Sequence, residues 1–358
     1  MYFTNCCIFG PCAYESIGAF MNYRKLGSSD LEISEIGFGT WPLGGPVKFQ
    51  GHSVGWRGIS DAEAIKMLKT CPDMGINFID TADIYGNGRA ESLIGKAYSE
   101  MGKTGQEMII ATKGGFVLDR DLPIGQNQDF SEKHLRQACE ASLKRLKREA
   151  IDLFQMHCIP LKVIEKGDCF LALDQLKKEG KIREYGVSIV MDKEAIAALE
   201  YPGVRSIQII FNLFRQKPVQ TVFPKAKEKG VGILARVPLA SGLLGGKYTH
   251  NQEFPDGDHR SEGIPGETFS GVNFKKGLEA VEELRSLEKK GERSFAQAAL
   301  SYTIQFPEVA TTIPGGLKIE HLKENAKVSG LPLFTSEEMS LCQRVYEKFF
   351  KDKMEKSY

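Results

Sequence analysis

Short apolar runs alternate with longer amphipathic stretches along most of the chain, from Asn22 onward. Eight of these runs have the length and composition of strands that are buried on both faces. They are residues 36–40, 76–80, 108–112, 151–156, 184–188, 206–211, 231–236 and 309–313. Ahead of them, residues 23–26 and 31–34 predict a small hairpin joined by residues 27–30.

The stretches between the runs repeat apolar residues at helical spacing, and two of them begin at a capping residue, Ser60 and Ser131. The expected helices are residues 61–74, 90–101, 131–148, 171–178, 193–199, 220–229, 274–289 and 295–305. Eight strand and helix units in strict alternation predict an α/β fold of the (β/α)8 TIM barrel type, rather than an open doubly wound sheet. An extra helix, residues 336–350, is expected outside the barrel or near its mouth.

Residues 22–358 are expected to form a single barrel domain, and residues 1–21 a disordered extension. The extension lacks the basic start and continuous apolar centre of a secretory signal. Two alternatives stay open, a lipid on Cys6, Cys7 or Cys12 and a true start at Met21. No run reaches the eighteen or so apolar residues that a membrane span needs, so no membrane association is expected.

Charge and cysteine content narrow the class of protein further. The 358 residues include 47 basic and 46 acidic ones, for a net charge of +1, which gives no field to hold a nucleic acid. The eight cysteines lack metal or redox spacing, so free thiols and a cytoplasmic location are expected. The histidines have no ligand partners at metal-binding spacing, so no metal is expected either.

Single reactive residues follow three successive predicted strands. Asp80 ends the second and Tyr85 lies five residues later, Lys113 follows the third, and His157 follows the fourth. The carboxyl ends of barrel strands meet at one face, so these four side chains are expected to form a catalytic site. Taken alone, Tyr85 is more simply a surface residue, Lys113 a solvated strand end and His157 a core histidine. Together, these residues favour a catalytic site.

These residues lie in segments that together resemble the aldo-keto reductase family, from Asn22 to about Gly330. The matching segments are residues 37–41, 77–86, 111–113, 152–157, 186–188, 208, 238–244, 313–315 and 324–325. The resemblance implies a TIM barrel that reduces aldehydes or ketones with NADPH. It also implies the absence of a dinucleotide fingerprint, and residues 86–91 accordingly end in Glu91 where that fingerprint has glycine.

Carbonyl reduction assigns a role to each residue of the predicted site. Hydride transfer leaves an alkoxide-like oxygen, which needs a nearby proton donor, and Tyr85 is the candidate. A phenol with a pKa near ~10 needs a neighbouring cation, which Lys113 would supply while Asp80 holds it in place. His157 would either polarise the carbonyl or relay a proton, whereas Asp83 is expected to cap the loop.

The resemblance also implies which residues contact the nicotinamide and the pyrophosphate. Ser188 and Gln208 match carboxamide contacts, and Phe211 stands where the family stacks an aromatic ring, with core packing as its alternative. Ile189 replaces a common asparagine. Further expected contacts come from the strand-one tip and from the loop after strand seven, which would wrap the pyrophosphate: Gly39, Thr40, Trp41, Pro238, Leu239, Ser241 and Gly242.

The residues after strand eight are expected to bind the 2'-phosphate and the adenine. Gly315 leads into a helix start beside Lys318, and Asn325 matches the adenine contact. His321 replaces a frequent arginine, which weakens fork-like phosphate binding. NADP(H) is therefore expected to be preferred, with NAD(H) as the alternative.

Two other functions are considered beside reduction. Lys113 could form a Schiff base in a lyase, or the chain could be an NADPH-binding regulatory subunit of an ion channel with little turnover. The partner is expected to be a small carbonyl compound, and the protein a monomer or small homo-oligomer. The identity of that carbonyl compound depends on the long loops 42–58 and 241–271 and on the C-terminal stretch. Trp41 and Trp56 suggest an apolar wall beside it.

Overall fold

The computed structural model describes residues 21–49, 52–56, 58–117, 127–254, 258, 260 and 272–351. The predicted N-terminal extension therefore lies outside the described residues except for Met21. Much of the second half of the predicted 241–271 loop lies outside them as well.

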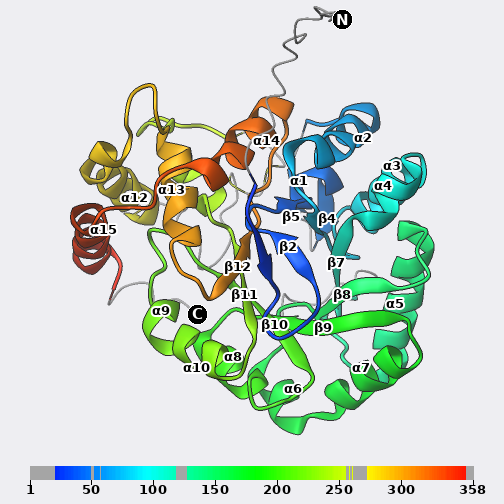
Figure 1. Cartoon of the computed structure of the whole chain (residues 1–358). Coiled ribbons are helices and arrows are strands. Elements are labelled where there is room, and N and C mark those ends of the chain that lie inside the picture. Colours follow the sequence, from blue (N-terminus) through cyan, green and yellow to red (C-terminus); the bar gives the residue numbers. More distant parts are fainter. Residues whose placement is uncertain are drawn as a thin grey trace, which may run out of the picture.

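Parallel strands form one eight-stranded sheet whose spatial order follows the order along the chain (Figure 1). The strands are β3 (Phe38–Gly39), β6 (Phe78–Asp80), β7 (Ile109–Gly114), β8 (Ile151–Met156), β9 (Ile182–Ser188), β10 (Val204–Ile210), β11 (Gly232–Arg236) and β12 (Val309–Thr312). Each overlaps one of the predicted runs.

The first and last of these strands meet and close the sheet. Gly37 N donates to Thr312 O at 2.8 Å, and Gly39 N donates to Pro314 O at 3.1 Å. Thr312 N donates in return to Glu35 O at 3.0 Å. The predicted (β/α)8 barrel is therefore confirmed.

Helices surround the barrel (Figure 1). They are α1 (Trp41–Gly44), α2 (Asp61–Thr70), α3 (Arg89–Ser99), α4 (Gly102–Glu107), α5 (Glu132–Leu146), α6 (Leu161–Lys166), α7 (Asp168–Lys178), α8 (Asp192–Ala198), α9 (Pro218–Thr221), α10 (Phe223–Glu228), α12 (Val272–Glu283), α13 (Phe295–Ile304), α14 (Ile319–Ala326) and α15 (Ser336–Phe349). Short 3-10 turns are η1 (Pro72–Met74), η2 (Ala240–Gly245), η3 (Arg285–Leu287) and η4 (Lys327–Gly330).

The predicted capping residues perform that role. The Ser60 side chain accepts from Glu63 N while the Glu63 carboxylate accepts from Ser60 N, which is a complete capping box. Ser131 likewise accepts from His134 N at the start of α5. The predicted extra helix is α15, which packs against α12 outside the barrel.

The predicted hairpin, β1 (Tyr23–Lys25) paired antiparallel with β2 (Glu32–Ser34), closes the amino-terminal end of the barrel. Leu26, Leu31 and Ile33 share one buried apolar cluster with residues of the barrel interior such as Phe78 and Leu153. The carboxyl-terminal end of the barrel, where the parallel strands finish, carries the predicted site residues Asp80 and Lys113.

Arg24 ties this hairpin to the rest of the molecule. Its guanidinium donates to the carbonyl oxygens of Ile304, Phe306 and Val309 at 2.8, 3.1 and 2.7 Å. It also pairs with the buried carboxylate of Glu35 at 2.7 Å. The hairpin is thus held both by apolar burial and by charge-assisted hydrogen bonds.

Some elements do not follow from the periodicity of the sequence. A second hairpin, β4 (Val47–Phe49) and β5 (His52–Val54), lies in the glycine-rich insertion after β3. Its strands are three residues each, too short for a repeating pattern to be visible.

The five cysteines that the structure describes are unpaired, as predicted. Within the described residues, no helix is long and apolar enough to cross a membrane.

Candidate functional site

Lys113 is the centre of a hydrogen-bonded cluster at the carboxyl end of β6 and β7. Its ammonium donates to Asp80 Oδ2 at 2.8 Å, to Thr81 O at 2.8 Å and to the Tyr85 hydroxyl at 3.1 Å. The Lys113 side chain is fully buried, and Asp80 is 3% exposed. The structure thus places Asp80, rather than Asp83, against Lys113.

The loop that carries Tyr85 is held closely against the first strand tip. Tyr85 N donates to Ala82 O at 3.1 Å. Gly86 follows with φ of 64°, and a Cβ atom there would lie 2.1 Å from Gly44 O. Only glycine permits this approach. The Trp41 ring lies 6.4 Å from the Tyr85 ring, so the phenol is bordered by an aromatic wall.

Gln208 holds the second oxygen of Asp80. Its amide nitrogen donates to Asp80 Oδ1 at 2.7 Å, and both residues are buried. The sequence resemblance assigns Gln208 to the nicotinamide carboxamide, and this bond to Asp80 was not predicted. The two donors leave Asp80 fixed in position with Lys113 on one oxygen and Gln208 on the other.

The electrostatics of this cluster keep the phenol protonated and the lysine charged. Desolvation raises the pKa of Tyr85 above its usual 10, and the nearby charge of Lys113 opposes that rise without cancelling it. Burial acts to lower the pKa of Lys113, but Asp80 and Tyr85 outweigh it and raise that pKa above its usual 10.5. At neutral pH, Tyr85 therefore carries a proton and Lys113 donates a hydrogen bond to its oxygen.

His157 follows β8 and faces the same region. Its ring lies edge-on to Tyr85 with centroids 5.9 Å apart, and edge-on to Phe116 at 4.9 Å. Burial, followed by the charges of Lys113 and Arg236, holds the pKa of His157 well below 6.5. A neutral imidazole can donate an N–H to a carbonyl oxygen, whereas a relay through its charged form is disfavoured.

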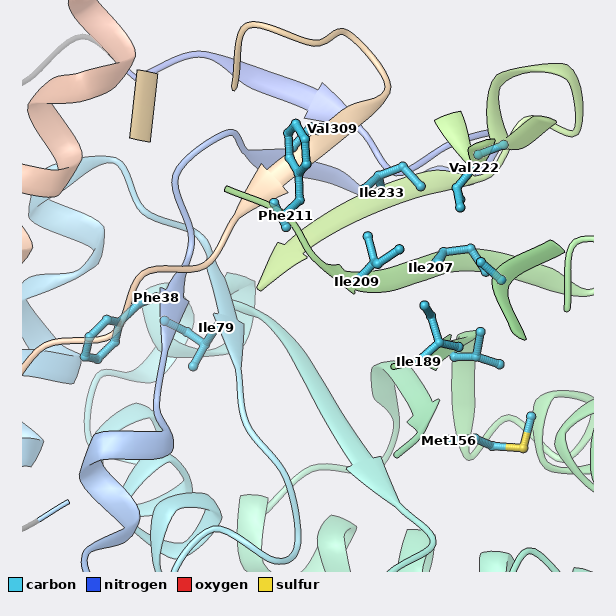
Figure 2. Close-up of a cluster of buried hydrophobic side chains, with 14 of the residues drawn as sticks. Phe38, Ile79, Met156, Ile189, Ile207, Ile209, Phe211, Val222, Ile233 and Val309 are labelled. Carbon is cyan, nitrogen blue, oxygen red and sulfur yellow. The ribbon is translucent and has the colours of Figure 1, made fainter. Parts of the chain in front are cut away.

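Phe211 does not face this region, which corrects its predicted stacking role. Its ring is fully buried among Phe223, Phe306 and Tyr302, at centroid distances of 4.9, 5.3 and 5.6 Å. Figure 2 shows Phe211 within the buried hydrophobic cluster that also contains Ile209. Side chains alternate along a strand, so when Gln208 points into the barrel, residue 211 points out of it. The core-packing alternative is the right one.

Arg236 is a site residue that the sequence prediction missed. It ends β11, and its Nη2 atom donates to Ile189 O at 3.1 Å. Its Nε atom is buried and has no hydrogen-bond partner among the described residues. The charge of Arg236 contributes to the lowered pKa of His157, and it opposes, without cancelling, the rise that burial causes in the pKa of Tyr85. The sequence did contain a signal for this residue, because Arg236 is a polar residue at the end of the apolar run 231–236, just as Lys113 follows the apolar run 108–112.

Several residues on the β9 and β11 tips suit a nicotinamide cofactor. Ser188 is 1% exposed, yet its hydroxyl has no partner among the described residues, so it is available to an amide group. Beyond β11, left-handed backbone occurs at Val237, Ala240, Ser241 and Gly242, with φ of 53°, 44°, 51° and 97°. Strained turns of this kind are typical of ligand-binding loops. Pro238 and Leu239 lie between them.

The tips of the first and last strands have a structural role. Gly39 and Gly315 form a parallel bridge, and Thr40 Oγ1 donates to Asp80 O at 2.9 Å. Gly39 and Thr40, predicted as cofactor contacts, therefore take part in closing the barrel and in holding the end of β6.

Cations gather around the start of α14. Lys318 precedes its first residue and is exposed, as is His321 one turn later. Partial desolvation and then the charge of Lys247 lower the pKa of His321 below 6.5, so Lys247 lies near enough to act on it. Asn325 is buried on the same helix. Lys247, on the loop after η2, is a further basic residue here that the sequence prediction did not include.

Two further carboxyl groups, those of Asp83 and Glu91, lie close to the loop that carries Tyr85. Glu91 is fully buried and accepts from Thr112 Oγ1 at 2.5 Å and from Arg145 Nε at 2.6 Å. Asp83 Oδ1 is buried and has no partner among the described residues. Desolvation, with the charge of Glu91, raises the pKa of Asp83 to about 8. Asp83 is therefore mainly protonated at neutral pH. Glu91, in contrast, forms the ion pair with Arg145.

We expect Asp83→Asn to remove a pH dependence from the stability of the protein. An aspartate whose folded-state pKa is raised from 3.8 to about 8 stabilises the fold at low pH and loses that contribution as pH rises between these values. At pH ~9 the variant should be more stable than the parent by roughly 2–4 kcal/mol. Urea unfolding from pH 5 to 9 measures this, and equal slopes for both proteins would contradict it.

Three comparisons place this geometry among known proteins. The aldo/keto reductase family model matches residues 35–347. An uncharacterized oxidoreductase, YqkF of Bacillus subtilis (strain 168), is 32% identical over 325 residues, which cover 90% of this chain and 96% of that protein. The holo form of aldo-keto reductase AKR11C1 from Bacillus halodurans has a TM-score of 0.73 and 27% identity, covering 94% of this chain and 99% of that chain.

The chain is also similar to a protein that is named as a channel subunit rather than as an oxidoreductase. A putative voltage-gated potassium channel subunit beta of Schizosaccharomyces pombe (strain 972 / ATCC 24843) is 31% identical over 326 residues. The match covers 85% of this chain and 87% of that protein.

Proposed function

The chain belongs to the aldo/keto reductase family and is an oxidoreductase, and from this premise we propose that it reduces an aldehyde or ketone with NADPH, Tyr85 supplying the proton. One observation carries the proposal. The Tyr85 hydroxyl accepts a hydrogen bond from Lys113, which is itself held by Asp80. This arrangement presents a protonated phenol whose conjugate base has a cation ready beside it.

Each residue of the cluster has a share in the reaction. Reduced nicotinamide, when bound, supplies the hydride for the carbonyl carbon. Tyr85 gives its proton to the carbonyl oxygen, and Lys113 stabilises the phenolate that is left. Asp80, fixed by Gln208, keeps Lys113 charged. The neutral imidazole of His157 donates its N–H to the carbonyl oxygen and orients it.

The rest of the proposed cofactor site follows the tips of the later strands. Ser188 meets the nicotinamide carboxamide, and residues 238–242 wrap the pyrophosphate with their backbone. Lys318, directly before α14, and Lys247, on the loop after η2, bind the 2'-phosphate, which favours NADP(H) over NAD(H). Asn325 meets the adenine. The five described cysteines, which are unpaired, fit a reducing compartment such as the cytoplasm.

We expect His321 to add to phosphate binding only in mildly acidic solution. Its pKa lies below 6.5, so the imidazole is neutral at pH 7 and becomes cationic as pH falls. Lowering pH from ~8 to ~5.5 should tighten NADPH binding more in the parent than in His321→Gln, by about 2–5-fold. Fluorescence titration with NADPH measures this, and NADH, which lacks the 2'-phosphate, is the control ligand. Parallel curves for the two proteins would rule out this contribution.

The Schiff-base alternative is disfavoured by the state of Lys113. A nucleophilic amine must be unprotonated, but Lys113 donates three hydrogen bonds and its pKa is raised above 10.5. The same charge that makes Lys113 a poor nucleophile makes it a good partner for the Tyr85 phenolate.

The channel-subunit name of the yeast relative supports a second candidate, an NADPH-binding regulatory subunit with little turnover. A screen of NADPH oxidation separates the two functions, with aliphatic, aromatic and sugar aldehydes and simple ketones as substrates. We expect turnover with at least one of these classes. Tight NADPH retention with no turnover on any of them would favour the regulatory subunit instead.

A further inference from the structure

Arg236 places an uncompensated positive charge at the carboxyl end of the barrel. It is partly buried, and its only hydrogen bond to a described residue goes from Nη2 to the backbone oxygen of Ile189, at 3.1 Å. Its Nε atom is buried without a partner among the described residues. No carboxylate in the part of the chain that the structure describes lies within ion-pair distance of it.

The other charges of the site are balanced, which makes Arg236 distinct. Lys113 is paired with Asp80 at 2.8 Å, so this pair contributes no net charge. His157 is neutral because burial and the two neighbouring cations lower its pKa. Among the described residues, the region that faces Tyr85 and His157 therefore carries one net positive charge, and that charge belongs to Arg236.

The position of Arg236 relative to Ser188 connects this charge to the cofactor. The arginine is bonded to Ile189, the residue directly after Ser188, and it lies one strand beyond Gln208 in the sheet. Ser188 carries the unpartnered hydroxyl that suits a carboxamide. A nicotinamide held through Ser188 therefore has the Arg236 guanidinium at its border, in the role that the resemblance gave to an aromatic ring.

We propose that Arg236 makes the site discriminate between the redox states of the cofactor, binding the neutral reduced nicotinamide more tightly than the cationic oxidised one. The proposal rests on the proposed function, because it requires a nicotinamide cofactor at this site. Its physical reason is repulsion between like charges in a partly desolvated region, where screening by water is weak. The reduced ring has no charge and escapes this repulsion.

Two simpler roles make different predictions. If Arg236 served only to anchor the cofactor phosphates, its loss would weaken both redox states equally, because both carry the same phosphates. If it served only to hold Ile189 O in place, its loss would lower stability and loosen both states alike. The ratio of the two dissociation constants is unaffected in both cases, so this ratio is the informative quantity.

The test compares NADPH and NADP+ binding to the full-length parent, Arg236→Met and Arg236→Lys. Methionine keeps an unbranched side chain without the charge, and lysine keeps the charge without the fork. The dissociation constants come from quenching of tryptophan fluorescence, for which Trp41 beside Tyr85 is a local reporter. Arg344→Met, an exposed arginine on α15, is the matched control for loss of one positive charge.

We expect the ratio of the NADP+ to the NADPH dissociation constant to fall by about tenfold in Arg236→Met. It should stay within about twofold of the parent in Arg236→Lys and Arg344→Met. An unchanged ratio in a folded Arg236→Met protein that binds both ligands would overturn the inference and leave the proposed function intact. Failure of the parent to bind either ligand would overturn the proposed function as well.

A kinetic measurement checks the same charge by a different route. Arg236 is one of the groups that lower the pKa of Tyr85, so its removal should raise that pKa further. The alkaline limb of the turnover profile should then move to higher pH in Arg236→Met and not in Arg236→Lys. A structural role alone does not produce a shift that depends on charge, so an identical limb in both variants would count against the inference.

Discussion

Tyr85→Phe is expected to lower the turnover of carbonyl compounds by about 10²–10⁴-fold, the usual contribution of one general acid. The substitution removes only the hydroxyl, so the ring still packs near Trp41 and His157. Lys113 keeps its bonds to Asp80 and Thr81. The loss should therefore appear in kcat, with NADPH affinity within about twofold of the parent.

Steady-state oxidation of NADPH and a separate binding titration measure these two quantities. Tyr185→Phe is the matched control, because its hydroxyl is also buried and makes one hydrogen bond, to Asp174 Oδ1 at 2.7 Å. That control should lose about 1 kcal/mol of stability and no turnover. If Tyr85→Phe turned over as fast as the parent, Tyr85 would not be the proton donor.

Asp80→Asn is expected to be the most destabilising conservative change in the site, at about 3–5 kcal/mol near neutral pH. It leaves the ammonium of Lys113 fully buried without a counter-charge. Asparagine keeps an oxygen that can accept a hydrogen bond, so the cost comes from the lost charge. Turnover should fall as well, because without Asp80 the pKa of Lys113 is no longer held up, and a less fully charged Lys113 stabilises the phenolate less.

The pH dependence distinguishes this cause from a general packing defect. In the parent, the pKa of Lys113 is raised above 10.5, so its contribution to stability is present below that pH and is lost only above it. Without Asp80, burial should bring the pKa of Lys113 below its unfolded-state value. Asp80→Asn should then gain stability as pH rises from neutral toward ~10, since the unfolded state holds more protons there.

Urea unfolding at several pH values measures this trend. Asp61→Asn is the control, because it removes one side of an ion pair whose carboxylate is 67% exposed. It should cost less than about 1 kcal/mol at any pH. A pH-independent loss in Asp80→Asn would mean that Lys113 is not the group responsible.

Periodicity was sufficient to predict the barrel because buried strands and amphipathic helices leave separate patterns in the sequence. The run 151–156 coincides with β8, and the start of α5 follows from the Ser131 cap. The hairpin β4–β5 was not predictable, because three residues per strand leave no period to detect.

The cluster around Lys113 was predictable for a related reason. Tyr85, Lys113 and His157 each follow an apolar run, and a closed parallel barrel brings such positions to one face. The resemblance to a known family then assigned the reaction. The resemblance was less accurate for the residues expected to contact the nicotinamide. Gln208 donates to Asp80, which was not predicted, and Phe211 packs outside the barrel.

The sequence by itself predicted the strands and the positions of the reactive side chains, because these depend on local pattern and on residue type. Its resemblance to a known family indicated the class of reaction. Only the tertiary structure decided which side of a strand faces the site. A shift of one position along β10 turns a side chain from the barrel interior to the helix layer, so Phe211 became core. Burial and partner geometry, which no local pattern records, left Arg236 without an ion-pair partner among the described residues and made Asp83 a protonated acid at neutral pH.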